Sequence, residues 1–195
     1  MLPADDAQDR FAVLGLPRKF SVDLGVAENN FKKLSRQVHP DRFATADPRA
    51  RKAALSRTVQ LNDAWRTLKD PIRRAEYLLE LAGFGLKGDD RKRPAEGSMR
   101  EVSAPPVLLM EILELREELA DAQRAGNVTK VQSMANAMRV RHAETLAALA
   151  AALDHPGKLE EAARLMVALR YYQRFLDEVP PEDAAHGSAN EAAHG

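Results

Sequence analysis

Apolar side chains recur at three- and four-residue steps along most of the chain, a spacing that puts them on one side of an α-helix. The first strong segment follows Asp23, an expected N-cap, and must end before Pro40. A second segment opens near Pro48 and closes at Pro71. We expect the two to form an antiparallel hairpin, with a short first helix near residues 11–16 packed on it. The expected core stripes are Phe31, Leu34 and Val38 in the first segment and Leu55, Thr58, Leu61, Asn62, Trp65 and Leu68 in the second.

Three further amphipathic segments cover residues 106–125, 128–153 and 158–178. Short turns separate them, and long helices joined by short turns predict an antiparallel three-helix bundle. No segment has the two-residue alternation of a strand, so the predicted fold class is all-α. The expected parts are a flexible N-terminus over 1–10, an N-terminal helical domain over 11–84, a charged Gly- and Pro-rich linker over 85–105, the bundle over 106–178 and a disordered tail over 179–195.

The 195 residues include 29 Lys and Arg against 29 Asp and Glu, so the formal net charge is zero. No overall field would hold nucleic acid or an anionic membrane, and recognition by charge must be local. Cys is absent, which excludes thiolate metal sites and thiol nucleophiles. The first ten residues are acidic without an apolar signal core, and no apolar run is long enough to span a membrane. These features predict a cytoplasmic protein that binds no membrane.

A His-Pro-Asp tripeptide at residues 39–41 follows the first strong helix and allows two interpretations. As helix-ending chemistry, His favours the C-terminal end of the helix dipole, Pro stops the helix and Asp suits a turn. As a site, the loop offers an exposed carboxylate beside a basic helical face. Lys32, Lys33 and Arg36 lie away from the apolar stripe of that helix. This arrangement predicts a docking edge for an acidic partner.

The segment 106–125 carries more apolar side chains than one helical stripe needs. At about 100° per residue, a narrow sector that can face the bundle core holds Leu108, Ile112, Leu115, Leu119 and Ala122. Other sides of the same helix hold Leu109, Met110, Leu113, Glu114, Glu117 and Asp121. Leucine and methionine beside acids suit a partner surface, while packing of Leu109 and Leu113 against the N-terminal domain is the alternative. In the last helix, Tyr171 and Phe175 also lie off the main apolar stripe.

The segments FKKLSRQVHPDRF and NDAWRTLKDPIRRAEYLL resemble the J-domain family, and the resemblance covers residues 11 to about 80. In that family a basic helix, a His-Pro-Asp loop and the next helix contact a DnaK-type chaperone and trigger its ATP hydrolysis. The resemblance implies that the trigger loop is His39, Pro40 and Asp41, and that the docking face is Lys32, Lys33 and Arg36. The chain has no phosphate-binding G-x-x-x-x-G-K-[ST] loop, so we expect it not to hydrolyse ATP itself.

The segments APPVLLMEILELREEL and LRYYQRFLDEV, with RRAEYLLELAGF, resemble the HscB family of J-type co-chaperones in iron–sulfur cluster assembly, over residues 11–178. The resemblance implies that the bundle binds an IscU-type scaffold protein and that the J-domain delivers it to the specialised chaperone HscA. The implied scaffold-binding residues are Leu109, Met110, Leu113, Glu114, Glu117, Asp121 and Tyr171. Asp121 and Tyr171 stand where the family often has Glu and Phe. The cysteine module of some eukaryotic members is missing, which is typical of a bacterial-type protein.

An enzyme, a nucleic-acid-binding protein and a general co-chaperone are the competing classes. Four carboxylates on one helix, Glu114, Glu117, Glu118 and Asp121, are usually a solvated face, and no nucleophile accompanies them. The five His residues show no metal-ligand spacing, so we expect no enzyme, metal or cofactor. Zero net charge and the lack of interleaved aromatics disfavour nucleic acid. The alternative function is a J-domain co-chaperone of a general DnaK chaperone, with its bundle used for client capture or dimerisation.

Overall fold

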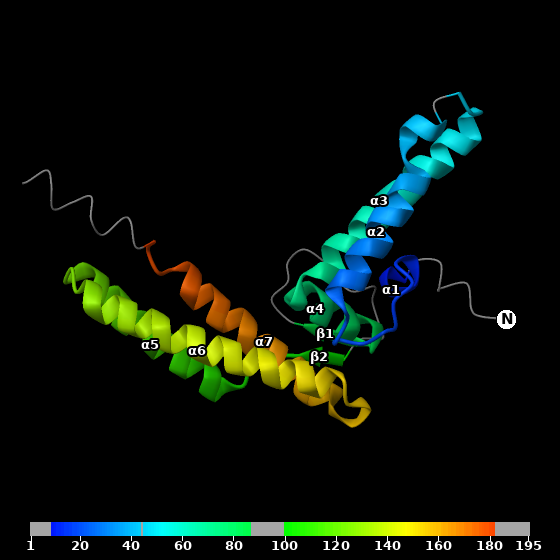
Figure 1. Ribbon diagram of the computed structural model, residues 1–195. Helices are drawn as coiled ribbons and strands as arrows, with labels where there is room; N and C mark the ends of the chain where they lie inside the picture. The colour runs from blue at the N-terminus through cyan, green and yellow to red at the C-terminus, as the bar shows by residue number, and fades with distance from the viewer. Residues whose placement is uncertain (1–8, 44, 87–99, 182–195) are drawn as a thin grey trace, which may run out of the picture. The chain divides into compact units, whose positions relative to one another are not determined.

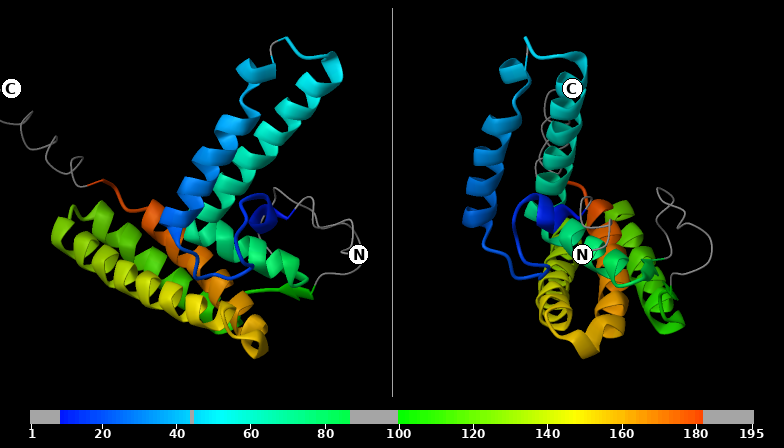
Figure 2. Two further views of the ribbon diagram at one scale, coloured as in Figure 1. Left: turned by 45° about the vertical axis from the view of Figure 1, so that its right-hand side comes forward. Right: turned by 90° about the vertical axis from the view of Figure 1, so that its right-hand side faces the viewer.

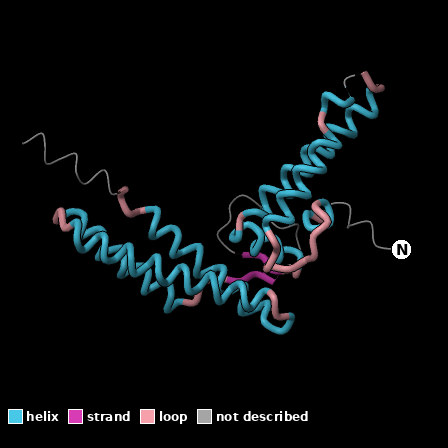
Figure 3. The backbone as a smooth tube through the Cα atoms, viewed as in Figure 1, coloured by secondary structure: helices cyan, strands magenta, loops and turns pink. Residues whose placement is uncertain are grey.

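A computed structural model describes residues 9–43, 45–86 and 100–181 of the chain. Helices make up nearly all of the regular structure (Figures 1 and 3), so the all-α prediction is confirmed. Internal contacts divide the chain into two compact units, one of residues up to Ala82 with Leu153–Pro156, the other of Gly83–Ala152 with the residues from Gly157 onward. Most of the expected N-terminal extension, linker and tail lies outside the described residues.

Local sequence sets the boundaries of the helices in the N-terminal unit. Asp23 accepts a hydrogen bond from the Val26 N–H at 3.0 Å, as its predicted N-cap role requires. Two further aspartates, each followed by a proline, cap the next two long helices in the same way. The elements are α1 (Arg10–Val13), α2 (Leu24–Val38), the 3₁₀ turn η2 (Pro40–Phe43), α3 (Pro48–Lys69) and α4 (Pro71–Leu81).

Helices α2 and α3 lie side by side as an antiparallel hairpin, which confirms the predicted pairing (Figures 1 and 2). Phe31 of α2 stacks on Trp65 of α3 with ring centroids 5.3 Å apart. The Thr58 hydroxyl donates a hydrogen bond to Val38 O at 3.1 Å, where α2 ends. One cluster of buried residues in this unit contains Phe11, Leu14, Leu61, Ala64, Leu68 and Tyr77.

Two positions in the expected α3 stripe were predicted wrongly. The Leu55 side chain is 58% exposed, and Asn62 is also exposed. A helix turns about 100° per residue, so Leu55 lies about 120° around the axis from the buried Leu61. The true core stripe is therefore narrower than the pattern of three- and four-residue steps suggested. The side of α3 outside this stripe, which includes Leu55 and Asn62, is exposed to solvent.

Asp9 fastens the start of α1 to the rest of the N-terminal unit. Its buried carboxylate accepts hydrogen bonds from the Arg18 Nε at 2.6 Å, the Tyr77 hydroxyl at 3.0 Å and the Phe11 N–H at 3.1 Å. Burial alone would raise the pKa of Asp9, but these three donors outweigh it and hold that pKa below its usual value. The carboxylate is thus stabilised in its charged form by the folded structure.

Residues 106–177 form the predicted three-helix bundle of α5 (Pro106–Arg124), α6 (Val128–Leu153) and α7 (Leu159–Asp177), with the 3₁₀ turn η3 (Pro156–Lys158) before α7 (Figure 2). Gly126 adopts a φ of 63° in the turn after α5, a left-handed conformation that suits glycine. One cluster of buried residues in the bundle contains Ile112, Leu119, Ala122, Val131, Met138, Tyr172 and Phe175.

The predicted core sector of α5 is confirmed, whereas the last helix differs from the prediction. Leu108 and Leu115 pack against the buried residues of α5 and its neighbours. Phe175, expected off the main stripe, is completely buried. Helix α7 contacts both α5 and a pair of short strands, so it buries more than one stripe of its surface. A single-stripe prediction therefore underestimated the core of this helix.

Two strands interrupt the helical pattern, in contrast to the prediction of none. The strands β1 (Phe84–Leu86) and β2 (Arg100–Val102) pair in parallel, with Phe84 opposite Arg100. Each has only three residues, too few for an alternating pattern to be recognised in sequence. The Phe84 side chain is buried and both strands contact α7. The expected linker over 85–105 therefore contains strand residues at 85–86 and 100–102, and residues 87–99 between them lie outside the described residues.

We expect Asp9→Asn to lower the free energy of unfolding at neutral pH by about 1–3 kcal/mol, because it removes a charged acceptor that is buried and hydrogen-bonded. The pKa of Asp9 is lower in the folded state than in the unfolded state, so its contribution is complete above the unfolded pKa of about 4. It is lost as the pH falls through the folded pKa. Urea unfolding followed by the fluorescence of Trp65, the single tryptophan, measures this difference.

The matched control is Glu28→Gln. Glu28 forms an exposed ion pair with Lys32 at 2.7 Å on α2, and such a pair contributes about 0.5 kcal/mol or less. The difference between wild type and Asp9→Asn should shrink on acidification, while Glu28→Gln should stay close to wild type throughout. A difference for Asp9→Asn that is the same at neutral and acid pH would contradict the assigned role of its charge.

Candidate protein-binding sites

The His39 loop follows directly from the end of α2. His39 has an extended backbone conformation with φ of −57° and ψ of 131°, as expected for a residue that precedes proline, and Pro40 opens η2. The Arg42 N–H donates to His39 O at 3.0 Å, and the Arg42 guanidinium donates to Arg36 O at 3.3 Å. The loop backbone is thus tied to the last turn of α2. It lies at the end of the hairpin away from α1 and α4 (Figures 1 and 2).

The loop presents a carboxylate to solvent. The Asp41 side chain is 87% exposed, and its Oδ2 lies 3.4 Å from His39 Nδ1. The Asp41 N–H donates to that same His39 nitrogen at 3.3 Å. These contacts between neighbours orient Asp41 without burying it. An exposed carboxylate on a tethered loop can form a charge-assisted contact with a partner at little cost in ordering.

The basic residues predicted beside the loop differ in whether their charge is already paired with a carboxylate of this chain. Lys32 forms an ion pair with Glu28 at 2.7 Å, so part of its charge is already matched. Lys33 and Arg36 are exposed, and no carboxylate in the described part of the chain pairs with either. The unmatched positive charge at this end of α2 therefore comes mainly from Lys33 and Arg36.

The second site is an apolar patch on α5, made of Leu109, Met110 and Leu113. These residues are 42%, 64% and 59% exposed, and they lie outside the sector of the helix that holds its buried residues. Val107 in the first turn is also exposed, and the sequence interpretation did not include it. Adjacent exposed leucine and methionine side chains form a surface from which a partner can displace water. None of the three residues thus belongs to the buried core of the bundle.

Carboxylates on α5 fall into two groups according to their partners. Glu118 pairs with Lys130 at 2.9 Å, and Glu111 pairs with Arg141, so these two connect α5 to α6. Glu114 and Glu117 are exposed, and the described residues offer neither of them a cation. Asp121 pairs with Arg124 in the next turn of its own helix. Glu114 and Glu117 are therefore the acids beside the apolar patch with free charge.

The predicted aromatic member of this site lies on α7. Tyr171 is half-buried and packs against the bundle core, while its neighbour Tyr172 is buried within that core. The Arg174 guanidinium carbon lies 5.8 Å from the centroid of the Tyr171 ring. Tyr171 and the α5 core residues thus belong to one packed cluster. That Tyr171 belongs to the same binding site as the apolar patch on α5 stays a prediction.

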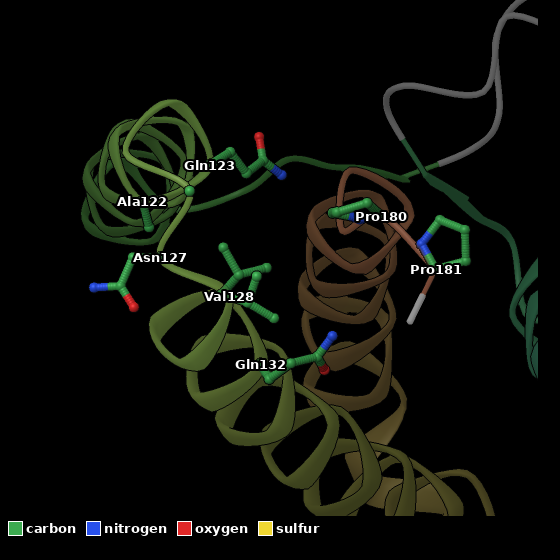
Figure 4. A pocket seen from close by; sticks show the side chains of 9 residues that line it. Ala122, Gln123, Asn127, Val128, Gln132, Pro180 and Pro181 are labelled. Carbon is green, nitrogen blue, oxygen red and sulfur yellow. The ribbon is translucent and has the colours of Figure 1, made fainter. Parts of the chain in front are cut away.

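A hollow at one end of the bundle was not anticipated from the sequence (Figure 4). Its volume is about 170 Å³, and the α5–α6 turn and the residues after α7 line it. The lining residues are Ala122, Gln123, Gly126, Asn127, Val128, Val131, Gln132, Pro180 and Pro181. None of these side chains is an acid, a base or a nucleophile, so this hollow has no group for acid–base or nucleophilic catalysis.

Within the ranges that the structure describes, no cluster of three or more His, Asp or Glu side chains is arranged to hold a metal ion. No helix in those ranges has both the length and the hydropathy that a bilayer crossing requires. His142 of α6 is half-buried, and burial lowers its pKa. The exposed loop and the exposed α5 patch are therefore the features that suggest binding to other proteins.

Comparison with known proteins identifies both units. Residues 9–77 match the family model of the DnaJ domain, and this match includes the hairpin and the exposed His-Pro-Asp loop. The chain is thus a J-domain protein. Residues 104–180, which contain the bundle, match the model described as the HSCB C-terminal oligomerisation domain. The chain belongs to the HscB family of co-chaperones.

Relatives and solved structures agree with this assignment. A co-chaperone protein HscB homolog from Azoarcus sp. strain BH72 is 32% identical over 186 residues, which are 95% of this chain and 98% of the relative. A homolog from Paraburkholderia phymatum is 31% identical over 87% of this chain and 90% of the relative. The structure of chaperone HscB from Vibrio cholerae aligns with a TM-score of 0.70 and 32% identity, over 88% of this chain and 94% of that one. The human HscB structure, at 24% identity over 88% of this chain and 80% of that one, has the same fold with a TM-score of 0.70.

Proposed function

We propose that this co-chaperone stimulates the ATPase of the DnaK-type chaperone HscA and delivers an IscU-type scaffold protein to it, in the cytoplasm, during iron–sulfur cluster assembly and transfer. The protein itself supplies no catalytic group, metal ligand or cofactor in this role. The chaperone is engaged by His39, Pro40 and Asp41 with Lys32, Lys33 and Arg36. The scaffold is engaged by Leu109, Met110, Leu113, Glu114, Glu117 and Asp121, with Tyr171.

The exposed apolar patch on α5 is the observation that carries this proposal. Leu109, Met110 and Leu113 keep between 42% and 64% of their side-chain surface in solvent, although a buried side is available on the same helix. Burying three such side chains against a partner removes apolar surface from water, which is the main favourable term in most protein association. Free Glu114 and Glu117 would orient that partner through its cations.

Membership of the HscB family supports the choice of partners. A J-domain acts on a chaperone of the DnaK type, and the iron–sulfur role follows from the family resemblance in both units. The description of the matched C-terminal family model favours a second use of the bundle, in oligomerisation. A co-chaperone with another client would use the same loop but would not bind an IscU-type scaffold, so scaffold binding separates the two functions.

We expect Asp41→Asn to abolish the stimulation of HscA ATP turnover, because the amide keeps the size of the side chain but loses the charge that contacts the chaperone. The measurement is the steady-state ATPase rate of HscA with and without IscU-type scaffold, titrated with this protein. Circular dichroism should be unchanged, since Asp41 is exposed and caps no α-helix. Stimulation equal to wild type would exclude Asp41 as the trigger.

Met110→Ala and Leu113→Ala should each weaken scaffold binding, because apolar residues at the centre of an interface dominate its energy. A loss of about 2 kcal/mol, or roughly thirty-fold in Kd, is expected for such a residue. Calorimetric titration with an IscU-type scaffold measures it. The matched control is Val140→Ala, which shortens an apolar side chain of α6 that is 58% exposed. Equal binding by all three variants would overturn the assigned patch.

The double variant Glu114→Gln with Glu117→Gln should weaken scaffold binding at low salt and make it less sensitive to salt, because two unpaired charges beside the patch are removed. Glu118→Gln is the control on the same helix, since its carboxylate already pairs with Lys130. Kd measured across a salt series separates the two. A salt dependence unchanged in the double variant would show that these acids meet no cation on the scaffold.

A further inference from the structure

The methionine side chains of this protein differ widely in their exposure. Four of the six methionines lie in the described ranges. Met138 and Met166 are buried, at 3% and 0% exposure, and Met134 is half-buried against the bundle core. Met110, in the apolar patch on α5, is 64% exposed. Among the described methionines, Met110 is therefore the one whose thioether a dissolved reagent reaches most freely.

Hydroperoxides are a class of reagent that acts on an exposed thioether. The sulfur attacks one peroxide oxygen, so that the O–O bond breaks and an S–O bond forms. With hydrogen peroxide, the departing hydroxide takes the proton of the transferred hydroxyl group and leaves as water. The sulfur is oxidised, the peroxide is reduced, and the product is methionine sulfoxide. The reaction needs no base, metal or cofactor from the protein, so access to the sulfur selects the residue that reacts.

The half of α5 that carries Met110 has acceptors but no side-chain donors. Residues 106–115 contain no side chain that donates a hydrogen bond at neutral pH. The carboxylate of Glu114, one turn further along the helix, is an acceptor like the sulfoxide oxygen itself. Arg141 reaches this half of α5 from α6, but its guanidinium pairs with Glu111. A partner that covers an oxidised patch would therefore bury a polar oxygen for which these side chains offer no donor, and such burial is unfavourable.

The N-terminal unit contains no comparable target. Residues 2–98 have neither Met nor Cys. The His39 loop and the hairpin that holds it thus contain no sulfur for a hydroperoxide to oxidise. Mild oxidation that reaches exposed methionines changes the apolar patch and leaves the sulfur-free loop unchanged.

We propose that Met110 is an oxidation-sensitive switch in the apolar patch, and that its reagent is a hydroperoxide. With the thioether reduced, the patch is apolar and binds the scaffold. With the sulfoxide formed, scaffold binding weakens while the His39 loop still stimulates the chaperone. Methionine sulfoxide reductases reverse the change. This inference rests on the proposed function, because it assigns a means of regulation to the scaffold-binding surface proposed there.

Two other consequences of oxidation fit the structure less well. Damage to the fold would require oxidant to reach buried sulfurs such as that of Met166. A harmless reaction at Met110 would require a bound scaffold to leave this side chain in water. At about 100° per residue, Met110 lies between Val107 and Leu113 around the helix axis. A scaffold that covers both of these neighbours also covers the sulfur between them.

The experiment treats the full-length protein with dilute hydrogen peroxide, removes the peroxide with catalase and titrates an IscU-type scaffold in a calorimeter. Peptide mass spectrometry measures the oxygen added at each methionine, including Met1 and Met99, which lie outside the described residues. Met110→Leu is treated in the same way, and its Kd after treatment is compared with its own Kd before. The matched control is Met134→Leu, which keeps Met110 and exchanges a half-buried methionine of the same bundle for a residue of similar volume.

Oxidation of Met110 should precede that of Met134, Met138 and Met166, and it should raise the Kd of the wild-type protein for the scaffold roughly ten-fold or more. Met134→Leu should show the same rise, whereas the Kd of Met110→Leu should not change on treatment. Methionine sulfoxide reductases for both sulfoxide epimers, with a thiol reductant, should restore wild-type binding. Stimulation of HscA in the absence of scaffold, and the circular dichroism spectrum, should be the same before and after treatment.

Several results would overturn the inference. One is unchanged scaffold binding by wild-type protein whose Met110 is shown by mass to be oxidised. A second is an equal loss of binding in treated Met110→Leu, which would assign the effect to another residue. A third is loss of helicity or of HscA stimulation on treatment, because weaker binding would then report general damage.

The untreated protein tests the proposed function separately. If it does not bind the scaffold, the proposed function fails and the switch fails with it. If it binds the scaffold and oxidation of Met110 has no effect on the Kd, only the switch fails.

Discussion

Burial on one side is the constraint that leaves apolar side chains of both α5 and α3 exposed to solvent. A helix in a hairpin or small bundle can bury only the sectors that face its neighbours, and the remaining sectors stay in solvent. On α5, Ile112, Leu119 and Ala122 occupy the buried sector, so Met110 and Leu113 cannot enter the same core. On α3, burial of Leu61 and Leu68 leaves Leu55 outside in the same way. The exposed apolar residues are thus a geometric consequence of how the core is built.

Some carboxylates of the bundle form ion pairs between its helices, and others have no cationic partner among the described residues. Glu118 with Lys130 and Glu111 with Arg141 join neighbouring helices of the bundle, and the Arg141 guanidinium carbon also lies 5.3 Å from the centroid of the Tyr172 ring. Such partly exposed pairs contribute little stability individually, but they occupy the carboxylates they involve. Carboxylates without such partners, above all Glu114, can pair with a cation of another molecule.

The packed hairpin of α2 and α3 holds the loop that carries the exposed Asp41 carboxylate. Stacking of Phe31 on Trp65 and the bond from Thr58 to Val38 hold the ends of the loop at a set separation. Asp41 is therefore presented by two packed helices, and a partner need not order the chain around it. The N-terminal anchor at Asp9 supports the same unit from its other end, through Tyr77 of α4.

The sequence alone determined the positions of the helices, the N-cap at Asp23 and the presence of a buried and an exposed apolar side on α5. These features depend on neighbours within a few positions along the chain. The sequence also located the tripeptide at 39–41 and the free side of α5 that carries Met110. Only the tertiary structure decided that Leu55 is exposed, that Phe175 is buried and that residues 84–86 pair with 100–102, since each depends on which distant segment lies alongside. The pairing of Glu118 and Glu111 on α5 was likewise decided by α6, whose Lys130 and Arg141 are distant in sequence. Periodicity describes the sides of a helix, but the number of sides that are buried is set by the neighbours that pack against it.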